Sequence, residues 1–130
     1  NRIDVWLNPA PVWDIDVDVG AARLNLDLRP FRVSSLTIDA GASNIEIHLG
    51  VRYEETTVRI DAGASSVRLL IPHDAGCELR EDSGVLRKNL RGMEKIRSGL
   101  YRTQNFHEAR QKIFVEMDLG LARLHVERVP

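Results

Sequence analysis

Apolar and polar residues alternate along most of this chain, which is the pattern of half-buried β-strands. In residues 14–19 three apolar side chains alternate with three aspartates, and after Gly20 the alternation resumes over residues 22–28. No stretch has a secure helical period. The pattern therefore predicts an all-β protein.

A unit of strand, tight turn and strand recurs four times along the chain. The copies read VDVGAARLNLDL, IDAGASNIEIHL, IDAGASSVRLLI and MDLGLARLHVER, at residues 17–28, 38–49, 60–71 and 117–128. We expect the glycine of each copy to supply a positive φ or a bend that no side chain would allow. The first three glycines are 21 and 22 residues apart, whereas the fourth follows after 57, so the phase is lost between residues 72 and 112.

The aligned copies give two apolar columns, with chemically unrelated residues between them. The columns are Leu24, Ile45, Val67 and Leu124, and Leu26, Ile47, Leu69 and Val126. Stacked coils bury their apolar faces only against their neighbours, so their outer residues are free to vary. A period of 21–22 residues is that of one solenoid turn. The repeats therefore predict a short β-solenoid of about six coils.

Aspartates form a third column, two residues before each repeat glycine. The column consists of Asp18, Asp39, Asp61 and Asp118. Stacked carboxylates repel each other, but an aspartate that accepts backbone N–H bonds in a turn tolerates this better. We interpret the column as structural, with a cation site as the alternative. Asp14, Asp16 and Asp18 also share one strand face, where a solvated surface is favoured over weak calcium binding.

The repeats resemble a known family. WDIDVDVGAARLNLDL, LTIDAGASNIEIHLG and VRIDAGASSVRLLIP are similar to the LiaF-like C-terminal domain, also called the toastrack domain, and so is the ending YRTQNFHEARQ with KIFVEMDLGLARLHVERV. The resemblance extends from about Trp13 to Val129. It implies a single-stranded right-handed β-helix without established catalytic residues. It also implies a membrane-tethered domain on the cytoplasmic side, with its anchor outside this chain, in a cell-envelope stress-response protein that restrains a sensor histidine kinase.

The whole chain, residues 1–130, is expected to form a single domain of this kind. We divide it into an N-terminal cap (1–12), regular coils (13–71), irregular coils with a basic segment (72–112) and a final coil (113–130). Trp6 and Trp13 flank the sequence NPAPV, whose prolines oppose a central strand. We expect this segment to cover the open end of the solenoid, since an uncovered edge invites pairing with another chain. A partner-binding hot spot is the alternative.

Charge is balanced over the chain but not along it. The net charge of −1 gives no global field toward nucleic acid, which we exclude as a partner. Between Gly84 and Arg102, however, there are six basic residues and only one acidic residue, Glu94. They are Arg87, Lys88, Arg91, Lys95, Arg97 and Arg102. This segment is the candidate interaction surface, for an acidic protein partner or anionic lipid heads; an ordinary solvated surface is the alternative.

No catalytic or metal-binding motif is recognisable. The four histidines have no second histidine or cysteine at ligand spacing, and Cys77 is expected to be a buried, inert thiol. P-loop, GxSxG, HExxH and dinucleotide motifs are missing. We therefore predict a non-enzymatic domain without a cofactor.

Three functions compete at this stage. The first is a regulatory interaction domain, the second a structural domain that self-assembles through its open coil ends into homo-oligomers, and the third a carbohydrate-binding β-helix. The third needs an aromatic-lined groove, and aromatic residues make up only 5% of the chain. We favour the first, with a membrane sensor kinase as the expected partner.

Overall fold

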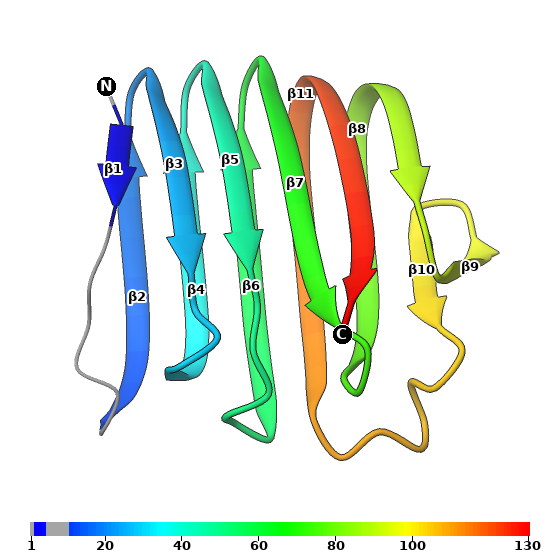
Figure 1. The fold of residues 1–130 in the computed structure, drawn as a ribbon. Coiled ribbons are helices and arrows are strands. Elements are labelled where there is room, and N and C mark those ends of the chain that lie inside the picture. Colours follow the sequence, from blue (N-terminus) through cyan, green and yellow to red (C-terminus); the bar gives the residue numbers. More distant parts are fainter. Residues whose placement is uncertain (1, 5–10) are drawn as a thin grey trace.

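Strands are the only regular elements in the part of the chain that the computed structural model describes, residues 2–4 and 11–130 (Figure 1). In chain order they are β1 (Arg2–Asp4), β2 (Val12–Val19), β3 (Ala22–Asp27), β4 (Arg32–Ala40), β5 (Ser43–His48), β6 (Glu55–Ala62), β7 (Ser65–Pro72), β8 (Gly76–Leu90), β9 (Met93–Arg97), β10 (Leu100–Thr103) and β11 (Lys112–Val129). The prediction of an all-β protein is confirmed.

The strands stack as the successive rungs of a solenoid. Each pair β2–β3, β4–β5 and β6–β7 forms one rung with two arms, and each of the long strands β8 and β11 forms both arms of a rung by itself (Figure 1). The first arms are joined in the order β2-β4-β6-β11-β8, and the second arms in the order β3-β5-β7-β11-β8, all parallel. The β-solenoid is confirmed, and its described strands make five rungs where about six coils were expected.

The fourth repeat does not lie at the end of the stack. Strand β11 pairs with β6 and β7 on one side and with β8 on the other, so the C-terminal strand is an interior rung. The segment between the third and fourth repeats therefore forms the outermost rung. In this segment β8 pairs with β11 over both arms, with register shifts between Leu119 and Leu121 and between Ala122 and Arg123.

The apolar columns read from the repeats exist as stacks of neighbouring side chains. Leu24 is in register with Ile45, Ile45 with Val67, and Val67 with Leu124, and each is at most 2% exposed. The second column is in register in the same way and is equally buried. Burial of one such side chain contributes roughly 1.5–3 kcal/mol, so these columns are the main source of stability.

The repeat glycines do not supply a positive φ, which was one of the two roles expected of them. Gly92 and Gly99 are the glycines with positive φ in the described chain, and none of the four repeat glycines is among them. A Cβ on Gly41 would lie 3.0 Å from the carbonyl oxygen of Gly20 in the preceding turn. A Cβ on Gly120 would lie 3.3 Å from the carbonyl oxygen of Gly63, whereas Gly20 and Gly63 have room for one. Close approach of neighbouring turns therefore restricts Gly41 and Gly120.

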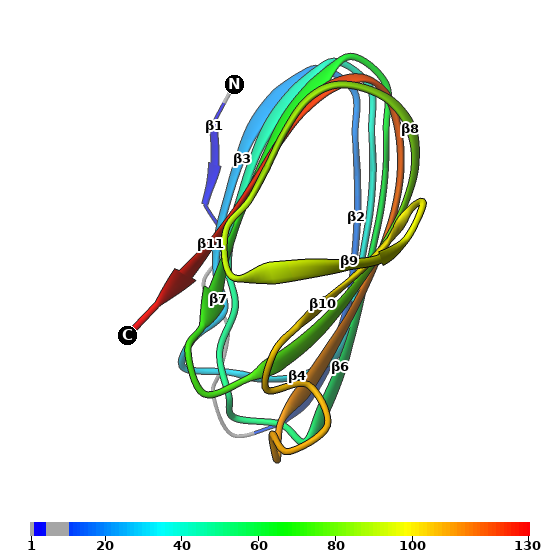
Figure 2. The ribbon, with the colours of Figure 1, turned by 90° about the vertical axis from the view of Figure 1, so that its right-hand side faces the viewer.

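The two ends of the stack are closed differently. At the end formed by β8, strand β10 pairs with residues 78–80 of β8, and β9 pairs with β10. Figure 2 shows β9 crossing the mouth of the solenoid at this end. We call β9 and β10 the end hairpin. At the N-terminal end β1 pairs with β3, and Trp13 packs against the core. Most of the predicted cap, including Trp6, lies outside the described residues.

Candidate functional site

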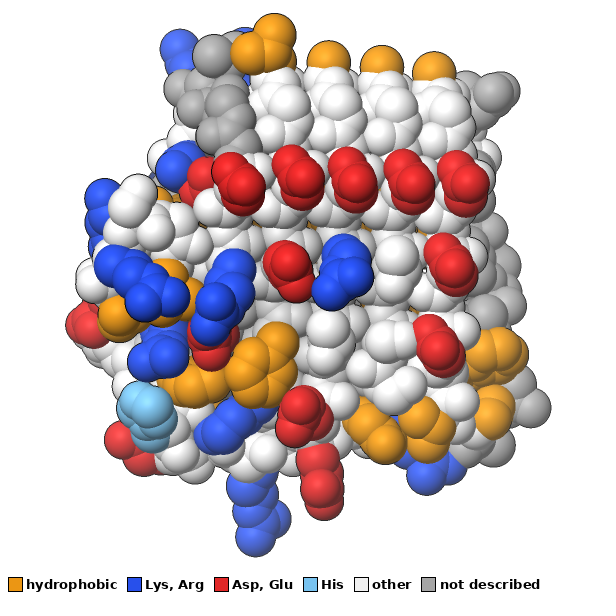
Figure 3. Space-filling model, turned by 180° about the vertical axis from the view of Figure 1, so that it is seen from behind, with side chains coloured by type: hydrophobic (Ala, Val, Ile, Leu, Met, Phe, Trp, Pro, Cys, Tyr) orange, Lys and Arg blue, Asp and Glu red, His pale blue; other side chains and the backbone are white. Residues whose placement is uncertain are grey.

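Aspartates form a continuous row across the outer face of the first arm. Neighbouring strands place one beside the next, and Figure 3 shows them as a row of acidic side chains. In stacking order they are Asp18, Asp39, Asp61, Asp118 and Asp82. The last member comes from β8, outside the repeat, and was not predicted. No group of three or more potential metal ligands occurs among the described residues, so the cation site finds no support here.

The six basic residues of the candidate interaction surface do not form one patch. Arg87 lines a shallow pocket on the outer face of the second arm, whereas Arg97 lines a separate one beside the first arm. Lys88 and Arg102 instead form ion pairs within the domain. Basic side chains do gather at the end of the stack that β8 forms, on the left of Figure 3.

Lys88 replaces a core residue in the outermost rung. It is in register with Leu124, the last member of an apolar column. Its ammonium nitrogen lies 2.7 Å from a carboxylate oxygen of Glu81, whose side chain is 4% exposed. This contact raises the pKa of Lys88 through a side-chain hydrogen bond to Glu81. The Lys88–Glu81 ion pair therefore lies in the outermost rung, β8. The apolar side chains of the stack contact this rung only from the side of β11.

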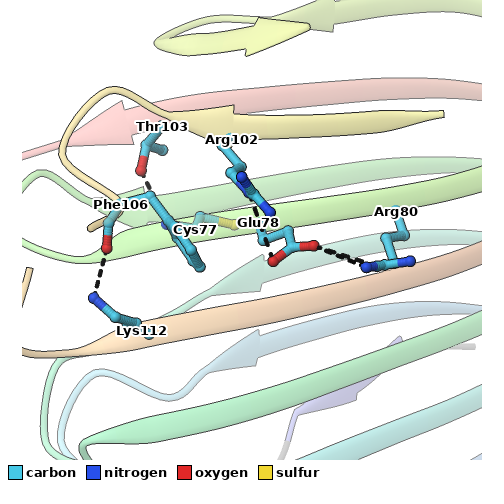
Figure 4. A network of polar contacts seen from close by, with 7 residues as sticks. All are labelled: Cys77, Glu78, Arg80, Arg102, Thr103, Phe106 and Lys112. Carbon is cyan, nitrogen blue, oxygen red and sulfur yellow. Dashed lines mark hydrogen bonds and ion pairs between the residues drawn. The ribbon is translucent and has the colours of Figure 1, made fainter. Parts of the chain in front are cut away.

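Arg102 helps to fasten the end hairpin to β8 (Figure 4). The buried carboxylate of Glu78 lies 3.3 Å from the guanidinium of Arg80 and 3.8 Å from that of Arg102. Next to this pair, the backbone N–H of Cys77 donates to Oγ1 of Thr103 at 3.0 Å. The Glu78–Arg102 ion pair and the Cys77–Thr103 hydrogen bond join β8 to β10 in addition to the strand pairing.

The loop that follows the end hairpin is held by one lysine. Nζ of Lys112 donates to the carbonyl oxygen of Phe106 at 2.6 Å (Figure 4). It also donates to the carbonyl oxygen of Ala109 at 2.8 Å. The same ammonium lies 5.2 Å from the centre of the Phe106 ring. The start of β11 thereby fixes the connection that carries the chain back into the stack.

Cys77 is buried, as expected for an inert thiol. Burial raises the pKa of its thiol to about 12. At neutral pH the sulfur is therefore protonated, and it lacks the thiolate that nucleophilic chemistry requires.

The remaining basic residues are exposed and have no ion-pair partner within the described chain. They are Arg87, Arg91, Lys95 and Arg97. Between the last two stands Ile96, an exposed large apolar side chain (49%). We call Lys95, Ile96 and Arg97 the hairpin surface. The sequence does show Ile96 as an apolar residue between two basic ones. A count of charges alone does not include it.

Arg123 is a second residue that the sequence did not reveal. It lies on β11, in register with Arg87 of β8. The two are 36 positions apart in the chain, and only the insertion of β11 beside β8 makes them neighbours. A charge count over a local window cannot detect such a pair.

Taken together, the fold and the site define a small parallel β-solenoid with a charged outer surface. The chain belongs to the toast_rack family: the family model described as "N-terminal domain of toast_rack, DUF2154" matches residues 1–70. The resemblance to the toastrack domain is thus confirmed. No curated protein matches the chain.

One solved structure has the same fold. It is the crystal structure of a "putative cell adhesion protein" from Clostridium sporogenes ATCC 15579, which superposes with a TM-score of 0.89 at 18% sequence identity. The match covers 95% of this chain and 58% of the other, so this chain spans little more than half of that protein. Within the described residues, no helix has the length and apolar character needed to cross a membrane.

Proposed function

We propose that this domain is a non-catalytic interaction module of a membrane-anchored cell-envelope stress-response protein, and that it restrains a sensor histidine kinase. Membership of the toast_rack family supports a solenoid that presents side chains at fixed spacing. The proposal places the domain on the cytoplasmic side of the membrane, next to the kinase that it binds. It requires neither a cofactor nor a metal.

The hairpin surface is the observation that carries this proposal. Ile96 is about half exposed between two cations that have no ion-pair partner within the described chain. An apolar side chain inside a charged rim is the usual composition of a contact site between proteins. We therefore expect a partner with an apolar contact and acidic neighbours.

The position of the hairpin suits this role. Its strands close the end of the stack (Figure 2), and the ion pairs and hydrogen bonds around Glu78 and Thr103 hold it there. A contact site on a preformed element loses little conformational entropy when it binds. The hairpin thus offers a rigid surface rather than a flexible segment that must order first.

The test is inhibition of the kinase by the full-length protein. The proposed partner, a sensor histidine kinase, is reconstituted with the full-length protein in vesicles, and autophosphorylation is measured. The variant Lys95→Glu/Ile96→Asp/Arg97→Glu should release the kinase. The matched control is Val51→Asp/Arg52→Glu, which changes another exposed apolar residue (Val51, 37%) beside an arginine and should inhibit like the wild type. Equal inhibition by both variants would refute the role of the hairpin surface.

Self-association is the second candidate, and one open strand edge favours it. Strand β2 pairs only with β4, so its other edge has no strand beside it in the described chain. The neighbour of the same fold, described as a "putative cell adhesion protein", is compatible with a role in assembly. Asp14, Asp16 and Asp18 on this edge oppose pairing of two copies through it. Light scattering that gives the monomer mass at every concentration would exclude this candidate.

A further inference from the structure

Two arginines stand side by side on the outer face of the second arm. Arg123 of β11 and Arg87 of β8 are register partners on adjacent rungs, about 4.8 Å apart along the stack. Both side chains are exposed, and neither has an ion-pair partner within the described chain. Like charges that face each other on neighbouring strands are destabilising. A pair without a counter-charge therefore calls for an explanation.

A β-bulge in β8 creates this pair. Ala122 is in register with Val85, but the next residue, Arg123, is in register with Arg87, so β8 contains one extra residue at this point. Without the extra residue Arg87 would stand beside Leu124, in the column that points into the core. The bulge thus turns Arg87 outward beside Arg123. Bulges are common where a strand re-aims a side chain toward a functional site.

The two arginines line a shallow pocket of about 570 Å³ in which no carboxylate takes part. Ser66, Asn89 and His125 also line it, and so does Arg68. The guanidinium of Arg68 is already neutralised, because it lies 3.5 Å from Glu46 and 3.2 Å from Glu127. Lys88 also lines the pocket, but its ammonium is paired with Glu81 at 2.7 Å. The free positive charge of the pocket therefore comes from Arg87 and Arg123.

We propose that Arg87 and Arg123 bind a phosphate group. Each guanidinium presents a planar fork of N–H donors that matches two oxygens of an oxyanion. One fork satisfies a carboxylate, whereas a phosphate has enough oxygens to accept from both, and its charge removes the repulsion between the arginines. Ser66, Asn89 and His125 supply further polar groups around the same space. This site is independent of the hairpin surface and of the proposed kinase partner.

The first test uses inorganic phosphate and the purified domain. Amide and arginine side-chain NMR signals are followed while phosphate is added into the millimolar range, with sodium chloride at matched ionic strength as the reference. We expect shifts centred on Arg87 and Arg123. The variant Arg87→Gln/Arg123→Gln should weaken binding by about tenfold or more, since charge-assisted hydrogen bonds to two side chains are lost. Both positions are exposed, so the variant should keep the wild-type thermal midpoint.

Arg52→Gln is the matched control. Arg52 is an exposed arginine in the segment between β5 and β6, and it does not line the pocket of Arg87 and Arg123. It should bind phosphate like the wild type. Unchanged binding by the double variant, or no phosphate-specific shift in the wild type, would overturn the proposal.

A second arm of the experiment identifies the source of the phosphate. Co-sedimentation is measured with phosphatidylglycerol vesicles and with phosphatidylcholine vesicles as the neutral reference. Binding to the anionic vesicles that depends on Arg87 and Arg123 would indicate a lipid headgroup, whereas binding of free phosphate alone would indicate a soluble phosphate compound. Either result supports the site. These binding experiments contain no kinase. A negative result would therefore overturn the phosphate site without contradicting the proposed inhibition of the kinase.

Discussion

At the scale of single residues, neighbours in the chain have opposite environments. Ile45 is 2% exposed within an apolar column, while Glu46 points outward and pairs with Arg68 at 3.5 Å. The same contrast recurs along β6, where buried and exposed residues alternate without exception. The effect of a substitution on stability therefore depends on whether its position faces inward or outward in the strand.

A pair of substitutions tests this dependence. Ile45→Asp should lower the free energy of unfolding by about 4 kcal/mol or more, because it buries a charge in the apolar column. Glu46→Lys should cost only about 0.5–1 kcal/mol, through repulsion from Arg68 in place of a surface ion pair. Urea denaturation measures both. Similar losses from the two variants would contradict the assignment of inner and outer faces.

A second residue-scale prediction concerns Asp27. Two hydrogen bonds from the Arg29 guanidinium, at 2.8 and 2.6 Å, lower the pKa of the Asp27 carboxyl to about 2. The folded form then has the lower pKa, so its contribution to stability is present above the ordinary pKa of 3.8 and is lost as the pH falls toward 2. Both side chains are more than half exposed, so the contribution is small and screened by salt.

The measurement is an NMR titration of the Asp27 carboxyl. In Arg29→Gln its midpoint should rise toward the ordinary value of an aspartate, because the hydrogen bonds from the guanidinium are lost. Asp16, an exposed aspartate of β2, is the internal reference in both proteins. An unchanged Asp27 midpoint in the variant would show that Arg29 is not the cause.

At the scale of elements, β8 carries most of the departures from the repeat. It contributes an unpredicted fifth member to the aspartate row, contains the bulge that turns Arg87 outward, and ends the core with Glu81 and Lys88. All of these follow from its place as the outermost rung. One side of β8 packs on β11, and the other faces only the end hairpin and solvent, so polar residues are tolerated where interior rungs need apolar ones.

The ion pair in this rung can be tested by substitution. Lys88→Met removes the ammonium from Glu81, whose side chain is 4% exposed. We expect a loss of about 2–3 kcal/mol, less than for a fully buried pair because Lys88 is itself partly exposed. The double variant Glu81→Leu/Lys88→Met should recover most of this loss, since an apolar pair can replace a buried ion pair. A double variant as unstable as Lys88→Met would contradict this account.

At the scale of the whole molecule, the stack is closed by elements on opposite arms. At one end β1 pairs with the second-arm strand β3, and at the other β10 pairs with the first-arm part of β8. Continuous end-to-end stacking of two copies would have to displace one of these strands. Alternate capping thus works against growth into fibres, which is how natural sheets protect their edges.

The position of β11 leads to a prediction for hydrogen exchange. Amides of β11 should be among the slowest to exchange, although the strand ends the chain, because it has a hydrogen-bonded strand on both sides. Amides of the edge strand β2 should exchange faster. Native-state exchange followed by mass spectrometry measures both. Rapid exchange of β11 would mean that the interior rung does not form in solution.

The local pattern of the chain was enough to predict the solenoid, its apolar columns and the family. Period-two alternation is a local property of the chain, and the repeats align the columns without any knowledge of the fold, as Leu24, Ile45 and Val67 show. The positive φ expected of the repeat glycines was wrong. The approach of Gly41 to Gly20 is a contact between turns, which a local pattern does not reveal.

The order of the rungs in the stack could not be predicted from the chain and is known from the folded structure. The insertion of β11 between β7 and β8 depends on burial and on backbone hydrogen bonds. Backbone hydrogen bonds can form between strands of different sequence, so the side chains do not indicate which strands will pair. That insertion separates the basic residues into internal ion pairs, the hairpin surface and the pair Arg87–Arg123. The sequence could count these charges, but their neighbours follow from the order of the stack.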